Sequence, residues 1–144
     1  MTLDEIQIRR LVEEKAAALR ARDPKAMVAG YGPDAVVFNL APPLRQPGDA
    51  RDPGPIEQWL STFEGPMDAE VRDLTVAVAG DVAFCTSLNR LTATPRGRTE
   101  SFDLWHRVTL GLRRLDGRWQ IVHEHESVPF EMDGSFQASI SLAP

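Results

Sequence analysis

The feature that most constrains the fold is an Asp-Gly pair, Asp116-Gly117, set between two long segments of alternating character. Together these segments run from Phe102 to Phe130. An Asp-Gly pair readily supplies the two positive-φ positions of a type I′ turn, so the stretch predicts a β-hairpin with a two-residue loop. Leu115 would then face Arg118, and every other pair follows by counting outward from the turn.

This counting also predicts which side chains share a face, because successive residues of a strand point to opposite sides. One face would carry Arg107 opposite Glu126 and Thr109 opposite Glu124, with Trp105 beside them. The other face would carry apolar side chains and three histidines: His106, Val108, Leu110, Leu112, Trp119, Ile121, His123 and His125. A one-residue slip would exchange the two sets, so the assignment depends on an unbroken ladder.

Length and composition bound the class of protein. The 144 residues predict one domain, 1–144, with a core large enough to need neither disulfides nor metals, and the single cysteine, Cys85, cannot form an internal disulfide. The net charge of −5 and the scattered basic residues argue against nucleic-acid binding. No apolar run is long enough to span a membrane and no signal peptide is recognisable, so we expect a cytoplasmic protein without a membrane partner.

The first third of the chain predicts helices. Thr2 and Glu5 form a capping-box pattern at the start of an amphipathic helix over 2–21. Asp23-Pro24 predicts an N-cap and first residue for a short second helix that ends near Tyr31. A third short helix is expected over 55–65; its Trp59 would be a core residue or a wall of a ligand site.

The rest of the chain predicts strands. A first strand is expected over 34–40, and residues 41–54 form a Pro- and Gly-rich loop long enough to be a lid or a mouth. From residue 69 onward, successive strands and turns predict an antiparallel meander that ends in the hairpin. Helices followed by such a meander are typical of an α+β fold with the helices on one face of a curved sheet.

Several stretches together carry a resemblance: the Asp-Pro helix start, YGPDAVVFN, the Pro-rich loop, the Trp-bearing helix and RRLDGRWQIVHEHES. The chain resembles the nuclear transport factor 2-like superfamily, and within it SnoaL-like proteins and ketosteroid isomerase homologues. The last stretch is also similar to the association domain of calcium/calmodulin-dependent kinase. The resemblance implies a cone: a bent antiparallel sheet whose concave side, closed by three N-terminal helices, holds a pocket, and whose outer side forms a homodimer interface.

The resemblance does not carry over the isomerase residues. Asn39 falls at the position of the isomerase's general base, Lys15 at that of its oxyanion-hole Tyr and Thr109 at that of its oxyanion-hole Asp. An amide cannot abstract the α-proton of a ketone, so steroid isomerisation by that mechanism is not expected.

Limonene-epoxide-hydrolase-like members are a better match. Asn39 matches their water-positioning Asn and Arg107 matches their Arg. Thr109 replaces one of their two Asp residues, while Glu124 or Glu126 could replace the other. One carboxylate with an Arg could still perform a simpler proton transfer.

Between the two glutamates, Glu124 is predicted to be the acid-base residue. A carboxylate inside the cone would have its pKa raised by desolvation, towards the range useful near neutral pH. Arg107 opposite Glu126 would keep Glu126 ionised, whereas Glu124 would face only Thr109. Alternatively, Arg107 and Glu126 form a structural cross-strand pair.

The remaining polar and aromatic candidates are ligand contacts. By resemblance to the kinase association domain, Asn89 is placed towards the pocket, and Trp105 would supply a flat apolar wall. His106, His123 and His125 on one face could in principle bind zinc. The resemblance instead puts that face at the dimer surface, where structural or interface histidines explain the pattern as well, so no metal is predicted.

Two classes of function therefore remain open. The first is a small enzyme without a cofactor, in which Glu124, assisted by Asn39, Arg107 and Thr109, isomerises, cyclises or hydrates an apolar organic substrate. The second is a non-catalytic ligand-binding, dimerisation or assembly domain. Fold alone does not decide between them, because this cone hosts both classes.

Overall fold

The structure, a computed structural model, describes all of residues 1–144. Its elements are α1 Leu3–Arg20, α2 Pro24–Val28, β1 Tyr31–Phe38, α3 Gly54–Leu60, β2 Phe63–Ala79, β3 Val82–Pro95, β4 Phe102–Leu115 and β5 Arg118–Ser127. The five strands form one mixed sheet in the order β1-β5-β4-β3-β2. The α+β class is confirmed. The expectation of a wholly antiparallel sheet is wrong at one edge, because β1 joins the last strand of the meander and runs parallel to it.

The helix starts lie where the sequence predicts them. The Thr2 hydroxyl accepts a hydrogen bond from the Glu5 amide at 3.2 Å and begins α1. The Asp23 carboxylate accepts one from the Ala26 amide at 3.1 Å and begins α2, with Pro24 in the first turn, where its missing N–H costs nothing. The prediction that this second helix reaches Tyr31 is wrong, since Tyr31 is the first residue of β1.

The third helix is shorter than predicted and β2 is longer. α3 ends at Leu60, and β2 starts at Phe63, not near residue 69. The predicted helix includes Gly65, but this glycine lies within a strand whose pairing to β3 is irregular between Glu64 and Asp68. Gly65 has a φ of 73°, which a glycine adopts at little cost, so the chain bends there without leaving the sheet.

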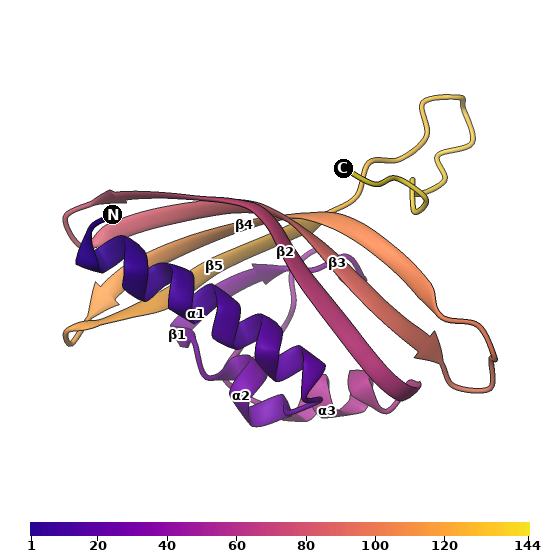
Figure 1. The fold of residues 1–144 in the computed structure, drawn as a ribbon, viewed down its shortest axis with the longest axis horizontal. Coiled ribbons are helices and arrows are strands. Elements are labelled where there is room, and N and C mark those ends of the chain that lie inside the picture. The colour runs from indigo at the N-terminus through magenta and orange to yellow at the C-terminus, as the bar shows by residue number, and fades with distance from the viewer.

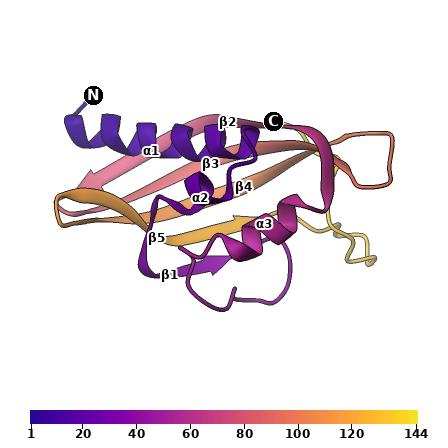
Figure 2. The same cartoon turned by 90° about the horizontal axis from the view of Figure 1, so that it is seen from below.

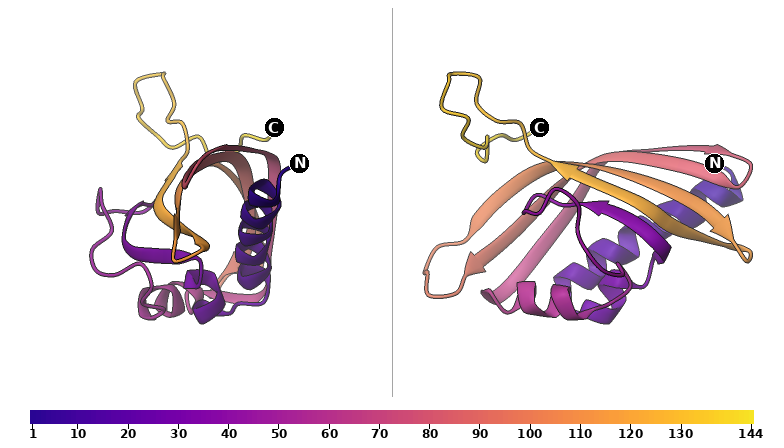
Figure 3. Two further views of the ribbon diagram at one scale, coloured as in Figure 1. Left: turned by 90° about the vertical axis from the view of Figure 1, so that its left-hand side faces the viewer. Right: turned by 180° about the vertical axis from the view of Figure 1, so that it is seen from behind.

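The sheet is strongly bent, and the helices cover its concave side (Figure 1). α1 lies along β2, while α2 and α3 lie below the sheet near β1 (Figure 2). Seen end-on, the sheet and the helices form a ring (Figure 3). The chain is thus a cone, as predicted, although the sheet is not closed. No helix combines the length and the apolar character needed to cross a membrane.

Two apolar clusters fill the concave side. The first joins α1 to β3, β4 and β5 and contains Ile8, Val12, Ala83, Cys85, Val108, Leu110, Leu112, Trp119 and Ile121. The second lies at the other end of α1 and contains Ala18, Met27, Leu60, Phe63, Met67, Leu91 and Ala93. Along β3 and β4, the inward-facing positions between the two clusters are partly polar: Ser87, Asn89 and His106.

The hairpin turn is confirmed. Asp116 and Gly117 have φ angles of 52° and 77°, as a type I′ turn requires. The ladder follows the predicted register from the pair Leu115–Arg118 as far as Leu112–Ile121. Near the turn, counting therefore gives the correct faces.

Beyond these pairs a β-bulge changes the register. Gly111 pairs with His123, which leaves Val122 without a partner on β4. The two strands come close here: a Cβ added to Gly111 would lie 3.3 Å from the Cβ of His123. The absence of a side chain at residue 111 thus permits the close approach of the bulged strand.

The predicted pairs beyond the bulge are wrong because of that extra residue. Arg107 faces Ser127, not Glu126, and Thr109 faces His125, not Glu124. A shift of one residue exchanges the faces of a strand. Glu124 and Glu126 therefore share the concave face with Val108 and Leu110, while the outer face takes His123 and His125.

Candidate acid-base site

Glu124 is the most deeply buried charged residue of the concave face, with 3% of its surface exposed. β5 positions it opposite Leu110 of β4, and the neighbouring β1 brings up Tyr31. The Tyr31 hydroxyl donates a hydrogen bond to Glu124 Oε2 at 2.6 Å. Lys15 Nζ of α1 lies 3.7 Å from Glu124 Oε1, so a negative charge on this carboxylate is compensated.

Lys15 and Tyr31 hold each other in place. Lys15 Nζ donates to the Tyr31 hydroxyl oxygen at 3.0 Å and to the Met27 carbonyl at 3.3 Å, and it lies 4.6 Å from the centre of the tyrosine ring. Burial, and then the charge of Glu124, raise the pKa of Tyr31 well above its ordinary value. The hydroxyl therefore keeps its proton and remains a donor to Glu124.

Glu126, two residues further along β5, has a different environment. It accepts no hydrogen bond, and 24% of its side chain is exposed. Burial raises its pKa from 4.5 to about 8, the charge of Glu124 adds to the shift, and Lys15 opposes it. Glu126 therefore keeps its proton near pH 7.

His106 of β4 lies next to Glu126. Its Nε2 is 3.8 Å from Glu126 Oε2, too far for a hydrogen bond. Burial lowers the pKa of His106 and outweighs the raising effects of the Leu104 backbone and of the charge of Glu124, so the imidazole is neutral near pH 7. Its Nδ1 is buried and has no hydrogen-bond partner.

Asn89 and Ser87 of β3 extend the polar band. Asn89 is the cross-strand partner of His106. The Ser87 hydroxyl donates to Asn89 Oδ1 at 2.8 Å, which orients the amide. No hydrogen bond uses the Asn89 amide nitrogen, so it is a free donor. A donor, a protonated carboxyl and a neutral imidazole therefore share this face.

Three predicted site residues lie away from this band. Arg107 is exposed on the convex face, where its Nε donates to Ser127 Oγ at 3.1 Å. Thr109 is exposed on the same face, and Asn39 is exposed just after the end of β1. The structure does not bring these three side chains together with Glu124.

The two predicted tryptophan contacts also lie outside the band. Trp105 is on the convex face, where the guanidinium of Arg72 lies 4.6 Å from the centre of its ring. Trp59 of α3 is 37% exposed and meets Phe63 edge to face, with ring centres 5.1 Å apart. Trp105 therefore packs against an arginine and Trp59 against the second apolar cluster.

Sequence reasoning missed Tyr31 and His106 as members of the site. The sequence predicts a helix end at Tyr31, and regular alternation places His106 on the same face as the two histidines that the bulge turns to the opposite side. The sequence does contain a pattern that indicates Lys15. It is four residues after Leu11 and four before Leu19, so helical spacing places this cation on the apolar side of α1. A charged residue at such a position needs a partner in the interior.

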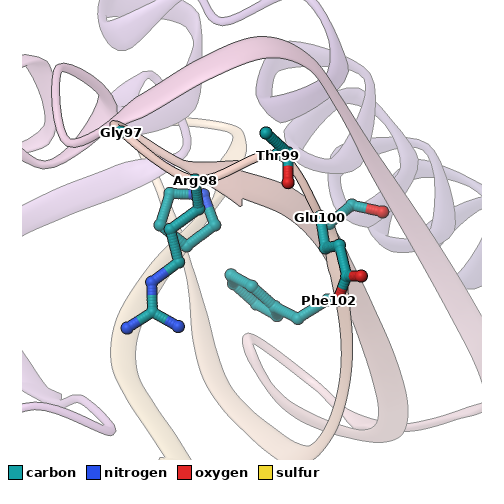
Figure 4. A pocket seen from close by; sticks show the side chains of 7 residues that line it. Gly97, Arg98, Thr99, Glu100 and Phe102 are labelled. Carbon is teal, nitrogen blue, oxygen red and sulfur yellow. The ribbon is translucent and has the colours of Figure 1, made fainter.

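Two surface hollows lie outside the polar band. One, of about 470 Å³, follows the β3–β4 turn and is lined by Pro95, Gly97, Arg98, Thr99, Glu100, Ser101 and Phe102 (Figure 4). The other, of about 390 Å³, is lined by Lys25, Val28, Ala29, Tyr31, Arg51 and Pro53. Only the second reaches a residue of the candidate site, Tyr31. No group of three or more histidine, cysteine or acidic side chains is arranged to hold a metal ion.

A family profile and a solved structure both place the chain in one family. The SnoaL-like domain profile matches residues 8–131. An NTF2-like protein of unknown function from Pseudomonas putida has 35% identity and a TM-score of 0.86, with 100% of this chain and 99% of that chain covered. No curated protein matches.

More distant structures share the fold. A candidate scytalone dehydratase from Novosphingobium aromaticivorans has 16% identity, a TM-score of 0.77 and coverage of 99% of this chain and 96% of that one. A candidate dehydratase of the NTF2-like family from Streptomyces avermitilis has 15% identity, a TM-score of 0.74 and coverage of 89% and 97%.

Proposed function

The chain belongs to the SnoaL-like family, and from that premise we propose that it is a cofactor-independent enzyme that transfers protons on a small, mainly apolar organic substrate. The observation that carries the proposal is the placement of His106 Nε2 3.8 Å from Glu126 Oε2 on the concave face. The gap is too long for a direct hydrogen bond, and two neighbouring parts of one substrate could each approach one of the two groups.

The protonation states suit general acid-base catalysis near neutral pH. Burial keeps the proton on Glu126, whose pKa is about 8, and lowers the pKa of His106. Glu126 therefore carries a proton that it can donate, and His106 is unprotonated and can accept one. A general acid and a general base in these states are what a proton-transfer step needs. Burial is the largest effect on both groups. The charge of Glu124 raises the pKa of Glu126 and also that of His106, and Lys15 lowers the pKa of Glu126.

The substrate would bind in a pocket walled by Glu126. The side chain of Glu126 is 24% exposed, and the surrounding protein still removes enough water to raise its pKa to about 8. A group that is both reachable and desolvated is expected at the wall of an internal pocket. Apolar clusters lie on both sides of the polar band, so the rest of the ligand would contact hydrocarbon.

The reaction class that fits these groups is the dehydration of a β-hydroxy ketone, or the related isomerisation or hydration. His106 takes the proton from the carbon between the carbonyl and the alcohol carbon, while Asn89 donates to the carbonyl oxygen. Glu126 protonates the leaving hydroxyl, which departs as water as the carbon–carbon double bond forms. Return of the proton from His106 to Glu126 restores the starting state. The two structural neighbours described as candidate dehydratases support this class.

The test is a set of β-hydroxy ketones and α-protic ketones incubated with the protein in D₂O and followed by proton NMR. We expect α-proton exchange and enone formation, with losses of roughly 100-fold or more in Glu126→Gln and His106→Asn. Glu14→Gln, an exposed helix carboxylate, is the matched control.

Equal rates in all four proteins would overturn the assignment of His106 and Glu126. Saturable binding without exchange or turnover for any compound would favour the alternative, a ligand-binding domain without catalysis.

A further inference from the structure

β5 ends before its neighbour β4 does. The last residue of β5, Ser127, pairs with Arg107, whereas β4 extends past this pair to Phe102. Pro129, which follows shortly after Ser127, has no N–H to donate to a ladder, so the sequence itself favours the end of the strand here. The edge of β4 from Phe102 to His106 therefore has no strand beside it on the β5 side.

The inward-facing side chains of β4 change their exposure where β5 ends. Val108, Leu110 and Leu112 lie beside β5 and are buried in the first apolar cluster. Leu104 and Phe102 face the same way beyond the end of β5, and they are only half-buried. An apolar strip that solvent reaches thus runs along the concave side from His106. We call Leu104 and Phe102 the edge strip.

The edge strip leads from the acid-base pair to a hollow at the surface. At one end, His106 Nε2 lies 3.8 Å from Glu126 Oε2. At the other end, Phe102 lines the hollow of about 470 Å³ at the β3–β4 turn (Figure 4). Its ring centre is 6.1 Å from that of Phe63, in the second apolar cluster. At about 3.3 Å per residue, His106 and Phe102 are roughly 13 Å apart along the strand.

The order of the strands orients a substrate on this strip. Asn89, His106 and Glu126 come from β3, β4 and β5, which are neighbours in that order. In the proposed dehydration these groups meet the carbonyl oxygen, the carbon that loses its proton and the leaving hydroxyl. The alcohol carbon therefore lies on the β5 side of His106, where the edge of β4 is open. A substituent on the carbonyl carbon would instead meet β3, whose inward-facing Leu91 is buried.

We propose that the substrate is a β-hydroxy ketone with a long, uncharged apolar tail on its alcohol carbon, and that Leu104 and Phe102 bind this tail. The inference rests on the proposed function, because the orientation follows from the roles given there to the three polar groups. A tail on the edge strip would remove hydrocarbon of both partners from water. The hollow beyond the strip is lined by Arg98 and Glu100, whose opposite charges favour a tail without net charge.

The test is an NMR titration of Glu126→Gln with two series of β-hydroxy ketones, one lengthened at the alcohol carbon and the other at the carbonyl carbon. Glutamine keeps the shape of the side chain and lacks the acidic proton, so binding is measured without turnover. We expect Kd to fall by up to roughly 4-fold for each methylene added at the alcohol carbon, until the tail spans about 13 Å. Lengthening at the carbonyl carbon should bring little gain.

Variants of the edge strip separate tail binding from general hydrophobic attraction. Leu104→Asn, added to Glu126→Gln, should abolish most of the gain per methylene, because a polar amide then faces the tail. Phe102→Ala should reduce the gain for the longest tails alone. Phe84→Ala is the matched control, since Phe84 is 55% exposed on the outer face of β3, and it should keep the full dependence on tail length.

Two results would overturn the tail assignment even if the wild type exchanges α-protons and forms enones: an equal gain in both series, or a gain that Leu104→Asn and Phe102→Ala leave unchanged. Failure of every compound to bind would also overturn it. A Kd that depends on the tail at the alcohol carbon, in a protein whose wild type shows no turnover, would support the tail assignment and contradict only the proposed chemistry.

Discussion

Replacing Glu126 by glutamine tests the central electrostatic feature of the concave face. The pKa of this carboxyl is raised from 4.5 to about 8, chiefly by burial and then by the charge of Glu124. The folded protein therefore holds a proton that the unfolded chain releases, and raising the pH favours unfolding. The stabilisation is fully present below pH 4.5, falls as the pH rises from 4.5 to 8, and is absent above that range.

The size of the effect follows from the shift. At about 1.4 kcal/mol for each pKa unit, ionising Glu126 in the fold costs on the order of 5 kcal/mol. The side chain is 24% exposed, so water reduces this figure by a modest amount. The amide of a substituted glutamine cannot ionise and keeps a similar shape. We therefore expect Glu126→Gln to resemble the wild type near pH 4 and to be several kcal/mol more stable near pH 9.

The assay is urea-induced unfolding, followed by tryptophan fluorescence at a series of pH values from 4 to 9. The difference in the free energy of unfolding between variant and wild type should grow across the window between the two pKa values and then level off. Glu14→Gln, at an exposed helix position, should follow the wild type throughout. Parallel profiles for Glu126→Gln and the wild type would refute the reasoning, because Glu126 would then titrate alike in the folded and unfolded states.

Three further predictions concern individual contacts. Tyr31→Phe removes the donor to buried Glu124 and should cost roughly 1 to 3 kcal/mol of stability in urea unfolding at pH 7; an unchanged midpoint would contradict this. Asp4→Ala removes the acceptor of the Trp119 indole N–H, so we expect the free energy of unfolding to fall by about 1 kcal/mol and the tryptophan emission to change. An unchanged stability and emission would contradict this contact. Burial raises the pKa of the Cys85 thiol to about 11, so a disulfide reagent at pH 8 should label Cys85 only after unfolding, and rapid labelling of the native protein would be the opposing result.

The parts of the fold that the sequence predicted are those with short-range causes. Thr2 and Asp23 begin their helices through hydrogen bonds to amides three residues later, and Asp116-Gly117 makes the turn through its own backbone angles. These interactions involve neighbours in the chain, so a local pattern contains the information.

The parts that escaped prediction have long-range causes. Gly111 is a local sign of a bulge, but where β5 takes its unpaired residue, Val122, depends on how that strand fits both β4 and β1. Tyr31 opens a strand because β5 is available as a partner for it, and its contact with Glu124 spans 93 positions in the sequence. The sequence correctly predicts that Glu124 is buried. It gives the wrong neighbour for Glu126, because the unpaired Val122 shifts the register and places Glu126 near His106 instead of opposite Arg107.

The bulge at Val122 also bears on how relatives of this chain are to be compared. In a relative that lacks the extra residue, the strand would be regular and the same side chains would point inward. In a relative whose bulge lies after the position of Glu126, the residues at the positions of His123 and His125 would point inward instead. Residue-by-residue alignments of the two would look almost perfect and would still equate an interior position with an exterior one. Roles inherited along this hairpin are therefore valid only when the site of the unpaired residue is aligned first.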